Sequence, residues 1–169
     1  MKDNCILNRT KLADEPIVEM LLTKKYGKSN IKFMKSFNDP DCTDTVCYGS
    51  GAQKNLYVKR NSCKYSYSPN FSIAINKNKL CVYNNACYVF VDEVANCLYI
   101  VDGIALLNYI VEHYDNVRQS DNSNNFYIVI PKSDIAELVS SPESIVRYNK
   151  AISDLFANCR DESQYAGLL

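Results

Sequence analysis

The sequence of 169 residues is poor in several residue types that mark particular protein classes. It has no tryptophan and only one histidine. It has only five glycines and five prolines, and these low counts exclude a collagenous or linker-dominated chain. Its apolar runs, such as residues 88–91 and 126–130, are far shorter than the roughly 20 residues that a membrane span requires. Residues 1–9 show no continuous apolar stretch, so no secretory signal is expected. These absences predict a soluble, cytoplasmic protein that does not associate with a membrane.

Composition favours one globular unit. Hydrophobic residues make up 47% of the chain and charged residues 22%, as in ordinary globular proteins. Two domains of about 85 residues would each have a thin core, so we predict a single domain over residues 1–169 with a frayed tail at 161–169. Thirteen tyrosines without tryptophan are typical of proteins encoded by AT-rich DNA. Many phages and low-GC bacteria have such DNA, and a phage origin is therefore one hypothesis.

The cysteines do not follow a metal-binding pattern. The eight are Cys5, Cys42, Cys47, Cys63, Cys81, Cys87, Cys97 and Cys159, and no two form a C-x-x-C pair. Only His113 could add an imidazole, so a structural zinc site is not expected. Without a secretory signal, we expect reduced thiols that act mostly as small buried hydrophobes.

The net charge of zero conceals an asymmetry between the two halves of the chain. Residues 1–80 contain 14 Lys or Arg against 7 Asp or Glu, a balance of +7, and residues 81–169 contain 5 against 12, a balance of −7. Lysine interleaved with tyrosine suits phosphate contact and base stacking. The candidate nucleic-acid-binding residues are Lys24, Lys25, Lys28, Lys32, Lys35, Arg60 and Lys64. In the alternative interpretation the two halves pack together, their charges cancel, and the lysines are solvated.

Hydrophobic periodicity predicts the order of the elements. Helices are expected over residues 14–26, 102–114 and 133–139, the last of these capped by Ser133, and from residue 141 onward. Strands are expected over residues 31–37, 43–48, 55–60, 71–76, 86–92, 97–101 and 126–130, with a polar loop at 116–125. This order predicts an α+β (mixed α/β) fold with a single central mixed sheet of about six strands flanked by helices. The predicted core comprises Ile73, Ile75, Val89, Val91, Leu98, Ile100, Ile128 and Ile130.

One stretch of the chain resembles a known family. Pro40-Asp41-Cys42-Thr43-Asp44 is followed, after twelve intervening residues, by Tyr57-Val58-Lys59. Together with a first helix that carries an acidic residue, this order resembles the PD-(D/E)xK nuclease-like fold. The resemblance implies that Asp44 or Asp41 is a metal ligand and that Lys59 is the active-site lysine. It implies that Glu19 is the acidic residue of the first helix.

The motif departs from the family at Tyr57, which stands where the family has Asp or Glu. Mg²⁺, which generates the nucleophile in such sites, prefers carboxylate oxygens and water, and tyrosine is a poor ligand for it. Three interpretations follow. Asp41 and Asp44 are turn residues and Lys59 a surface lysine; or the fold persists without activity and binds nucleic acid; or another carboxylate completes an active, Mg²⁺-dependent nuclease.

The functional hypothesis is a nucleic-acid-associated protein with a nuclease-like, catalytically degenerate core. Its partner is nucleic acid or a protein that handles nucleic acid. The alternative from a different class is a non-catalytic inhibitor that binds a host or phage nucleic-acid enzyme. Whether the chain is an enzyme and which oligomer it forms are open at this point.

Overall fold

The structure is a computed structural model. It describes residues 17–34, 44–48, 52–60, 69–75, 83–119, 121 and 125–154, and for 31–34, 44–48, 52, 53 and 60 it describes the backbone alone. Lys35, Asp41, Lys64 and the tail at 161–169 lie outside the described residues.

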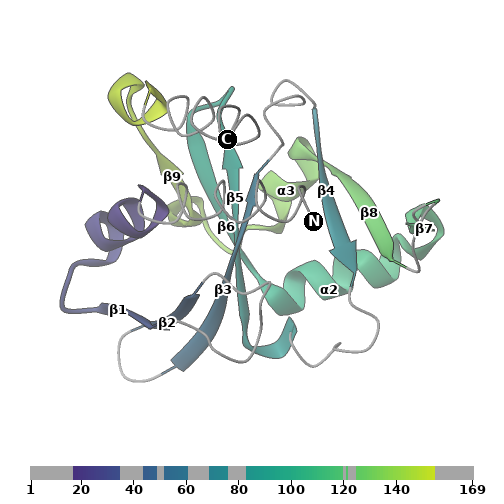
Figure 1. The fold of residues 1–169 in the computed structure, drawn as a ribbon, viewed down its shortest axis with the longest axis horizontal. Coiled ribbons are helices and arrows are strands. Elements are labelled where there is room, and N and C mark those ends of the chain that lie inside the picture. Colours follow the sequence, from purple (N-terminus) through teal and green to yellow (C-terminus); the bar gives the residue numbers. More distant parts are fainter. Residues whose placement is uncertain are drawn as a thin grey trace, which may run out of the picture.

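A six-stranded mixed sheet forms the centre of the fold (Figure 1). Its strands are, in spatial order, β1 (Ile31–Met34), β2 (Asp44–Tyr48), β3 (Ala52–Arg60), β5 (Ala86–Asp92), β6 (Cys97–Asp102) and β9 (Ile145–Arg147). Strands β3 and β5 pair in parallel and every other pair in this sheet is antiparallel. The predicted α+β class with a mixed sheet of about six strands is confirmed.

The chain also forms a second sheet, which the sequence did not separate from the first. It has the order β4 (Asn70–Ile75), β8 (Phe126–Pro131) and β7 (Arg118–Gln119), all antiparallel. Strands 71–76 and 126–130 were predicted correctly as strands, but they pair with each other. The alternation of apolar residues along a strand indicates which residues face a core. It does not indicate which other strand pairs with it.

Four helices surround the sheets within the described residues: residues 17–26, α2 (Gly103–Glu112), α3 (Lys132–Leu138) and residues 150–154. Short 3₁₀ turns lie at residues 83–85, η3 (Tyr114–Asn116) and η4 (Pro142–Ser144). In the part of the chain that the structure describes, no helix has the length and apolarity to cross a membrane.

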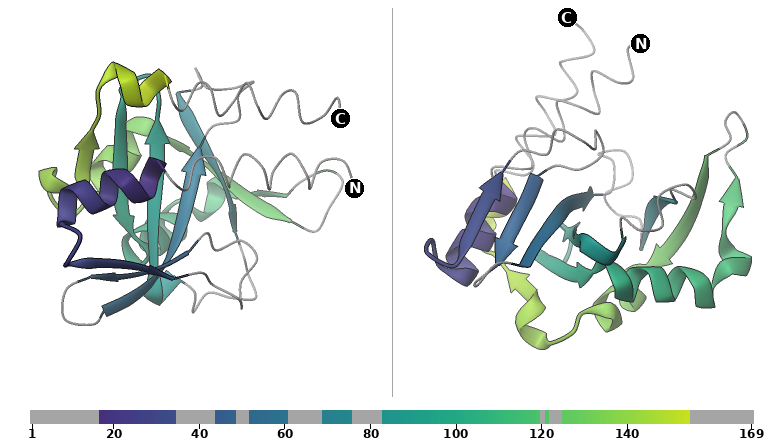
Figure 2. Two further views of the ribbon diagram at one scale, coloured as in Figure 1. Left: turned by 60° about the vertical axis from the view of Figure 1, so that its left-hand side comes forward. Right: turned by 90° about the horizontal axis from the view of Figure 1, so that it is seen from below.

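The central sheet separates two cores, because β5 is buried along its whole length and contributes to both. On one face, the first helix packs Val18 and Leu22 against the sheet. On the other face, α2, α3 and the second sheet cover it, as the two views of Figure 2 show. Of the predicted core residues, Ile75 is half-buried and the others are buried: Ile73, Val89, Val91, Leu98, Ile100, Ile128 and Ile130. Cys87 and Cys97 are also buried and form no disulfide.

The prediction of a long helix from residue 141 is wrong. The chain instead makes the short turn η4 and then the edge strand β9, and the last helix begins at residue 150. Val146 pairs with Leu98 and Ile145 with Tyr99 at the open edge of β6. Apolar residues at this spacing fit a helix and a short strand equally well, and the unpaired edge of the sheet favours the strand.

Two smaller predictions also fail. Ser133 does not cap α3, because that helix begins at Lys132 directly after β8 and has no side-chain cap. The expected loop at 116–125 contains the two-residue strand β7, which pairs with β8. Both differences occur at the ends of β8. Helix α3 begins directly after its last residue, and β7 pairs with its first two residues.

A buried ion pair joins the central sheet to the layer formed by the second sheet and α3. Asp92 at the end of β5 is 4% exposed, and its Oδ1 accepts a hydrogen bond from Lys132 Nζ at 2.9 Å. The same oxygen accepts from the backbone N–H groups of Val94 and Ala95, both at 3.1 Å, in the turn before β6. The lysine ammonium also lies 5.7 Å from the ring centre of Phe71 on β4.

Replacement of Lys132 by Met leaves the Asp92 carboxylate buried without its counterion. We expect Lys132→Met to lower the free energy of unfolding by about 3–5 kcal/mol, measured by urea denaturation. The matched control is Lys150→Met, which breaks the exposed Lys150–Asp154 pair and should change stability by less than about 1 kcal/mol. Equal effects of the two substitutions would show that the Asp92–Lys132 pair does not connect the layers.

Candidate functional site

Two of the predicted catalytic residues, Glu19 and Lys59, lie on different sides of the central sheet. Val58 packs against the core beneath the first helix, whereas Tyr57 belongs to the core on the opposite face. Side chains alternate along a strand, so half-buried Lys59 lies on the Tyr57 face. Glu19 is exposed on the first helix, which covers the other face. The sheet therefore stands between Glu19 and Lys59, and the structure does not bring them together.

Tyr57 is a core residue. It is 4% exposed, and its ring stacks on that of Tyr88 with centroids 4.9 Å apart and planes 15° apart. Tyr88 stacks in turn on Tyr83 and Phe90, with centroid distances of 6.0 Å and 6.4 Å. The position that is a carboxylate in the PD-(D/E)xK motif is thus filled by an aromatic ring within a stacked cluster.

The metal-ligand predictions at Asp44 and Asp41 stay predictions. The backbone of Asp44 pairs with that of Leu56 on β3, but its side chain lies outside the described part of the structure, as does all of Asp41. Among the described residues, no three His, Cys, Asp or Glu side chains gather closely enough to hold a metal ion.

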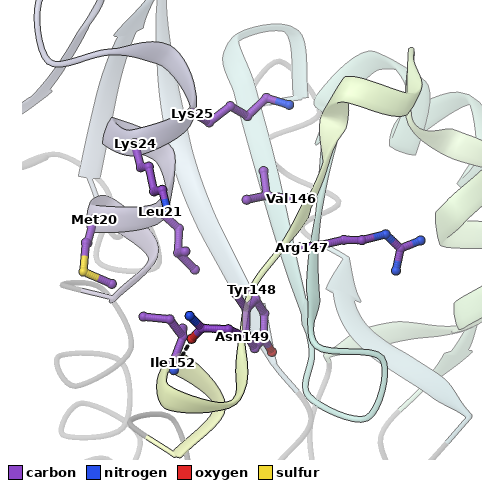
Figure 3. Close-up of a pocket in the computed structure, with 9 residues that line it drawn as sticks. All are labelled: Met20, Leu21, Lys24, Lys25, Val146, Arg147, Tyr148, Asn149 and Ile152. Carbon is purple, nitrogen blue, oxygen red and sulfur yellow. Dashed lines mark hydrogen bonds between the residues drawn. The ribbon is translucent and has the colours of Figure 1, made fainter.

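A groove lies between the first helix and the segment that follows η4 (Figure 3). Its volume is about 600 Å³, within the range of ligand pockets. The helix supplies one wall and β9 with the start of the last helix supplies the other. The lining residues are Met20, Leu21, Lys24, Lys25, Val146, Arg147, Tyr148, Asn149 and Ile152.

Local hydrogen bonds fix the second wall of the groove. Asn149 caps the last helix, because its Oδ1 accepts a hydrogen bond from Ile152 N at 3.3 Å. Tyr148 is held at both ends, since its N–H donates to Asn96 O at 3.0 Å and its hydroxyl to Asp92 O at 3.3 Å. The wall is therefore tied to the turn that the Asp92 carboxylate organises.

The charge of the groove is positive. Its lining includes three cationic side chains and no carboxylate. Lys24 is exposed and Lys25 is half-buried; desolvation lowers the pKa of Lys25, and the nearby charge of Glu143 opposes this effect. The Lys25 ammonium also lies 5.5 Å from the ring centre of Tyr26. Figure 3 shows Lys25 reaching across above Val146, while Arg147 extends away from both lysines.

The structure brings together two of the predicted nucleic-acid-binding residues, Lys24 and Lys25. Exposed Lys28 follows directly after the end of their helix at Gly27, whose φ of 83° ends the helix. Only the backbone is described for Lys32 and Arg60. Sequence reasoning missed Arg147 and Asn149, which belong to the acidic half. The one available signal was Asn149 itself, a favoured helix N-cap before Lys150.

The fold of this chain is similar to that of a solved structure, whereas its sequence has no match among the two other kinds of comparison. No protein-family model and no curated protein matches the sequence. A solved structure described as "D212, a nuclease from a fusselovirus" is similar over 92% of this chain and 94% of that chain, with 11% identity and a TM-score of 0.48.

The buried position of Tyr57 can be tested by restoring the carboxylate of the motif. We expect Tyr57→Glu to lower the free energy of unfolding by about 3 kcal/mol or more, because it removes a stacked ring and buries a charge. Tyr57→Phe, which keeps the ring, is the control and should lose no more than about 1.5 kcal/mol. Urea denaturation measures both. A Tyr57→Glu protein as stable as the parent would contradict the core assignment.

Proposed function

We propose that this protein binds nucleic acid through the groove between the first helix and β9, on a core whose nuclease-like motif is catalytically degenerate. The observation that carries the proposal is the pairing of Lys24 and Lys25 at a groove whose lining contains no carboxylate. The described part of the chain contains ion pairs at Lys54, Lys132 and Lys150, and none at the groove lysines. Apart from the nearby charge of Glu143 at Lys25, no described carboxylate neutralises these lysines, so they can bind an anionic ligand.

Phosphate binding follows from this arrangement by simple electrostatics. Each lysine that neutralises a phosphate releases a condensed counterion, which gives affinity without sequence specificity. Lys28 is exposed and follows directly after the helix that carries Lys24 and Lys25, so it adds a third positive charge to this segment. The acidic half of the chain contributes Val146, Tyr148 and Asn149 to the groove, and these side chains are uncharged. The opposite charges of the two halves therefore do not cancel here.

Catalytic degeneracy is supported by the motif residues. Tyr57 is stacked in the core, and Glu19 and Lys59 lie on opposite faces of the sheet. A Mg²⁺ site needs hard oxygen ligands that converge on one point. Mg²⁺ would be a cofactor only if the side chains of Asp41 and Asp44 completed an active site. The tyrosine-rich, tryptophan-free composition supports a phage origin for the protein.

Binding should depend strongly on salt. With about three phosphate contacts, from Lys24, Lys25 and Lys28, we expect log K to fall against log salt with a slope of about −2 to −3. The double variant Lys24→Gln, Lys25→Gln should reduce the size of this slope by about 1 to 2. Fluorescence anisotropy of a labelled oligonucleotide measures it. Lys150→Gln removes the same kind of charge outside the groove and should leave the slope unchanged.

Absence of DNA and RNA binding at low salt would refute the proposal. It would leave the alternative from the sequence, a non-catalytic inhibitor that binds a host or phage nucleic-acid enzyme.

Cleavage is a separate test. We expect no cleavage of DNA or RNA by the purified protein with Mg²⁺ or Mn²⁺, assayed by gel electrophoresis of labelled oligonucleotides. Metal-dependent cleavage that disappears in Asp44→Ala would contradict the degenerate site and support an active nuclease. The same variant distinguishes a contaminating nuclease, because cleavage by a contaminant would persist in the Asp44→Ala preparation.

A further inference from the structure

Apolar side chains line the groove beside the charged ones. Met20, Leu21, Val146 and Ile152 line it, and Met20 is 44% exposed. Lysines on a flat surface would suffice to hold phosphates. An apolar hollow beside them instead suits a ligand that carries both a negative charge and a flat, weakly polar body. The methionine thioether is suited to this contact, because sulfur interacts favourably with aromatic rings.

Asn149 adds an oriented polar group to the same hollow. Its Oδ1 accepts from the backbone N–H of Ile152, which can only donate, so the side-chain amide has one orientation. The NH₂ group is then the free end, and Figure 3 shows it on the side of Leu21. It can donate hydrogen bonds to a carbonyl oxygen or a ring nitrogen, which are the acceptors on the edges of nucleobases.

From this combination we infer that the groove binds single-stranded nucleic acid, with an unpaired base against Met20 and Asn149 and the flanking phosphates on Lys24 and Lys25. The inference rests on the proposed nucleic-acid function and specifies its substrate class. In a duplex the bases are paired and stacked inside, and only the backbone could reach a hollow of this kind. A single strand can turn a base outward, so that apolar contact and charge act together.

The test compares three probes of one length at one low salt concentration: a single-stranded oligonucleotide, the duplex of the same sequence, and an abasic strand. The abasic strand keeps the phosphates and lacks the bases. We expect the single strand to bind at least about tenfold more tightly than either of the others, since contact with one base contributes on that scale. Fluorescence anisotropy gives the three dissociation constants.

Two variants separate base contact from phosphate contact. Met20→Ala and Asn149→Ser should each weaken single-strand binding by about three- to tenfold and leave abasic-strand binding unchanged. Serine can still accept the capping hydrogen bond from the backbone N–H of Ile152, and like asparagine it is uncharged. Asn149→Ser therefore removes only the side-chain amide donor. Val111→Ala is the matched control for Met20, because Val111 is an exposed apolar residue on α2 outside the groove, with 65% exposure. Circular dichroism verifies that all three variants fold.

The outcomes distinguish this inference from the function on which it rests. Equal affinity for all three probes, or variants that weaken abasic and intact strands alike, would overturn the single-strand inference and leave phosphate binding in place. Failure of all three probes to bind would overturn the proposed function and the inference together.

Discussion

The carboxylate of Asp92 lies almost fully buried at the end of β5, and donors from two parts of the chain surround it. Lys132 reaches it from the start of α3, and two backbone N–H groups reach it from the turn before β6. A buried charge is tolerated only when it is paired and hydrogen-bonded, so these groups must stay in place together. The position of the second sheet and α3 against the central sheet depends on this constraint.

The same turn also positions the groove. Tyr148 bonds to the backbone carbonyls of Asp92 and Asn96, so the wall that follows β9 is anchored to the turn between β5 and β6. The opposite wall is anchored by burial, since Val18 and Leu22 hold the first helix on the sheet while Lys24 and Lys25 remain at the groove. The groove therefore joins residues more than 120 positions apart, through two elements that each pack on the same sheet.

A sequence motif and the place of its residues in a fold are different properties. Tyr57 and Lys59 are two positions apart, and in a strand this spacing puts them on one face. That face is covered by the second sheet, and Tyr57 is buried there, stacked on its neighbour Tyr88 of β5. The open, positively charged groove, and not the buried Tyr57, is the part of this chain that is accessible to a ligand.

Sequence alone determined the features that depend on near neighbours. These are the first helix with its stop at Gly27, the two hairpins, α2 with its Asp102 cap, and one alternating set of core residues in each of β4, β5, β6 and β8, although β5 and β6 bury residues on both faces. It also indicated that Lys24 and Lys25 belong to a positive surface. Local hydrogen-bonding and burial preferences are sufficient for each of these.

Only the tertiary structure decided how strands pair beyond the two hairpins, and through those pairings where the groove lies. Strands β4 and β8 are as apolar as those of the central sheet, and their own residues do not specify a separate sheet. Ile145 and Val146 fit a helix as well as a strand, until the open edge of β6 offers them hydrogen-bonding partners. Because this strand leads into Tyr148 and Asn149, the second wall of the groove could not be predicted. Its position depends on an edge formed by residues about 50 positions earlier in the chain.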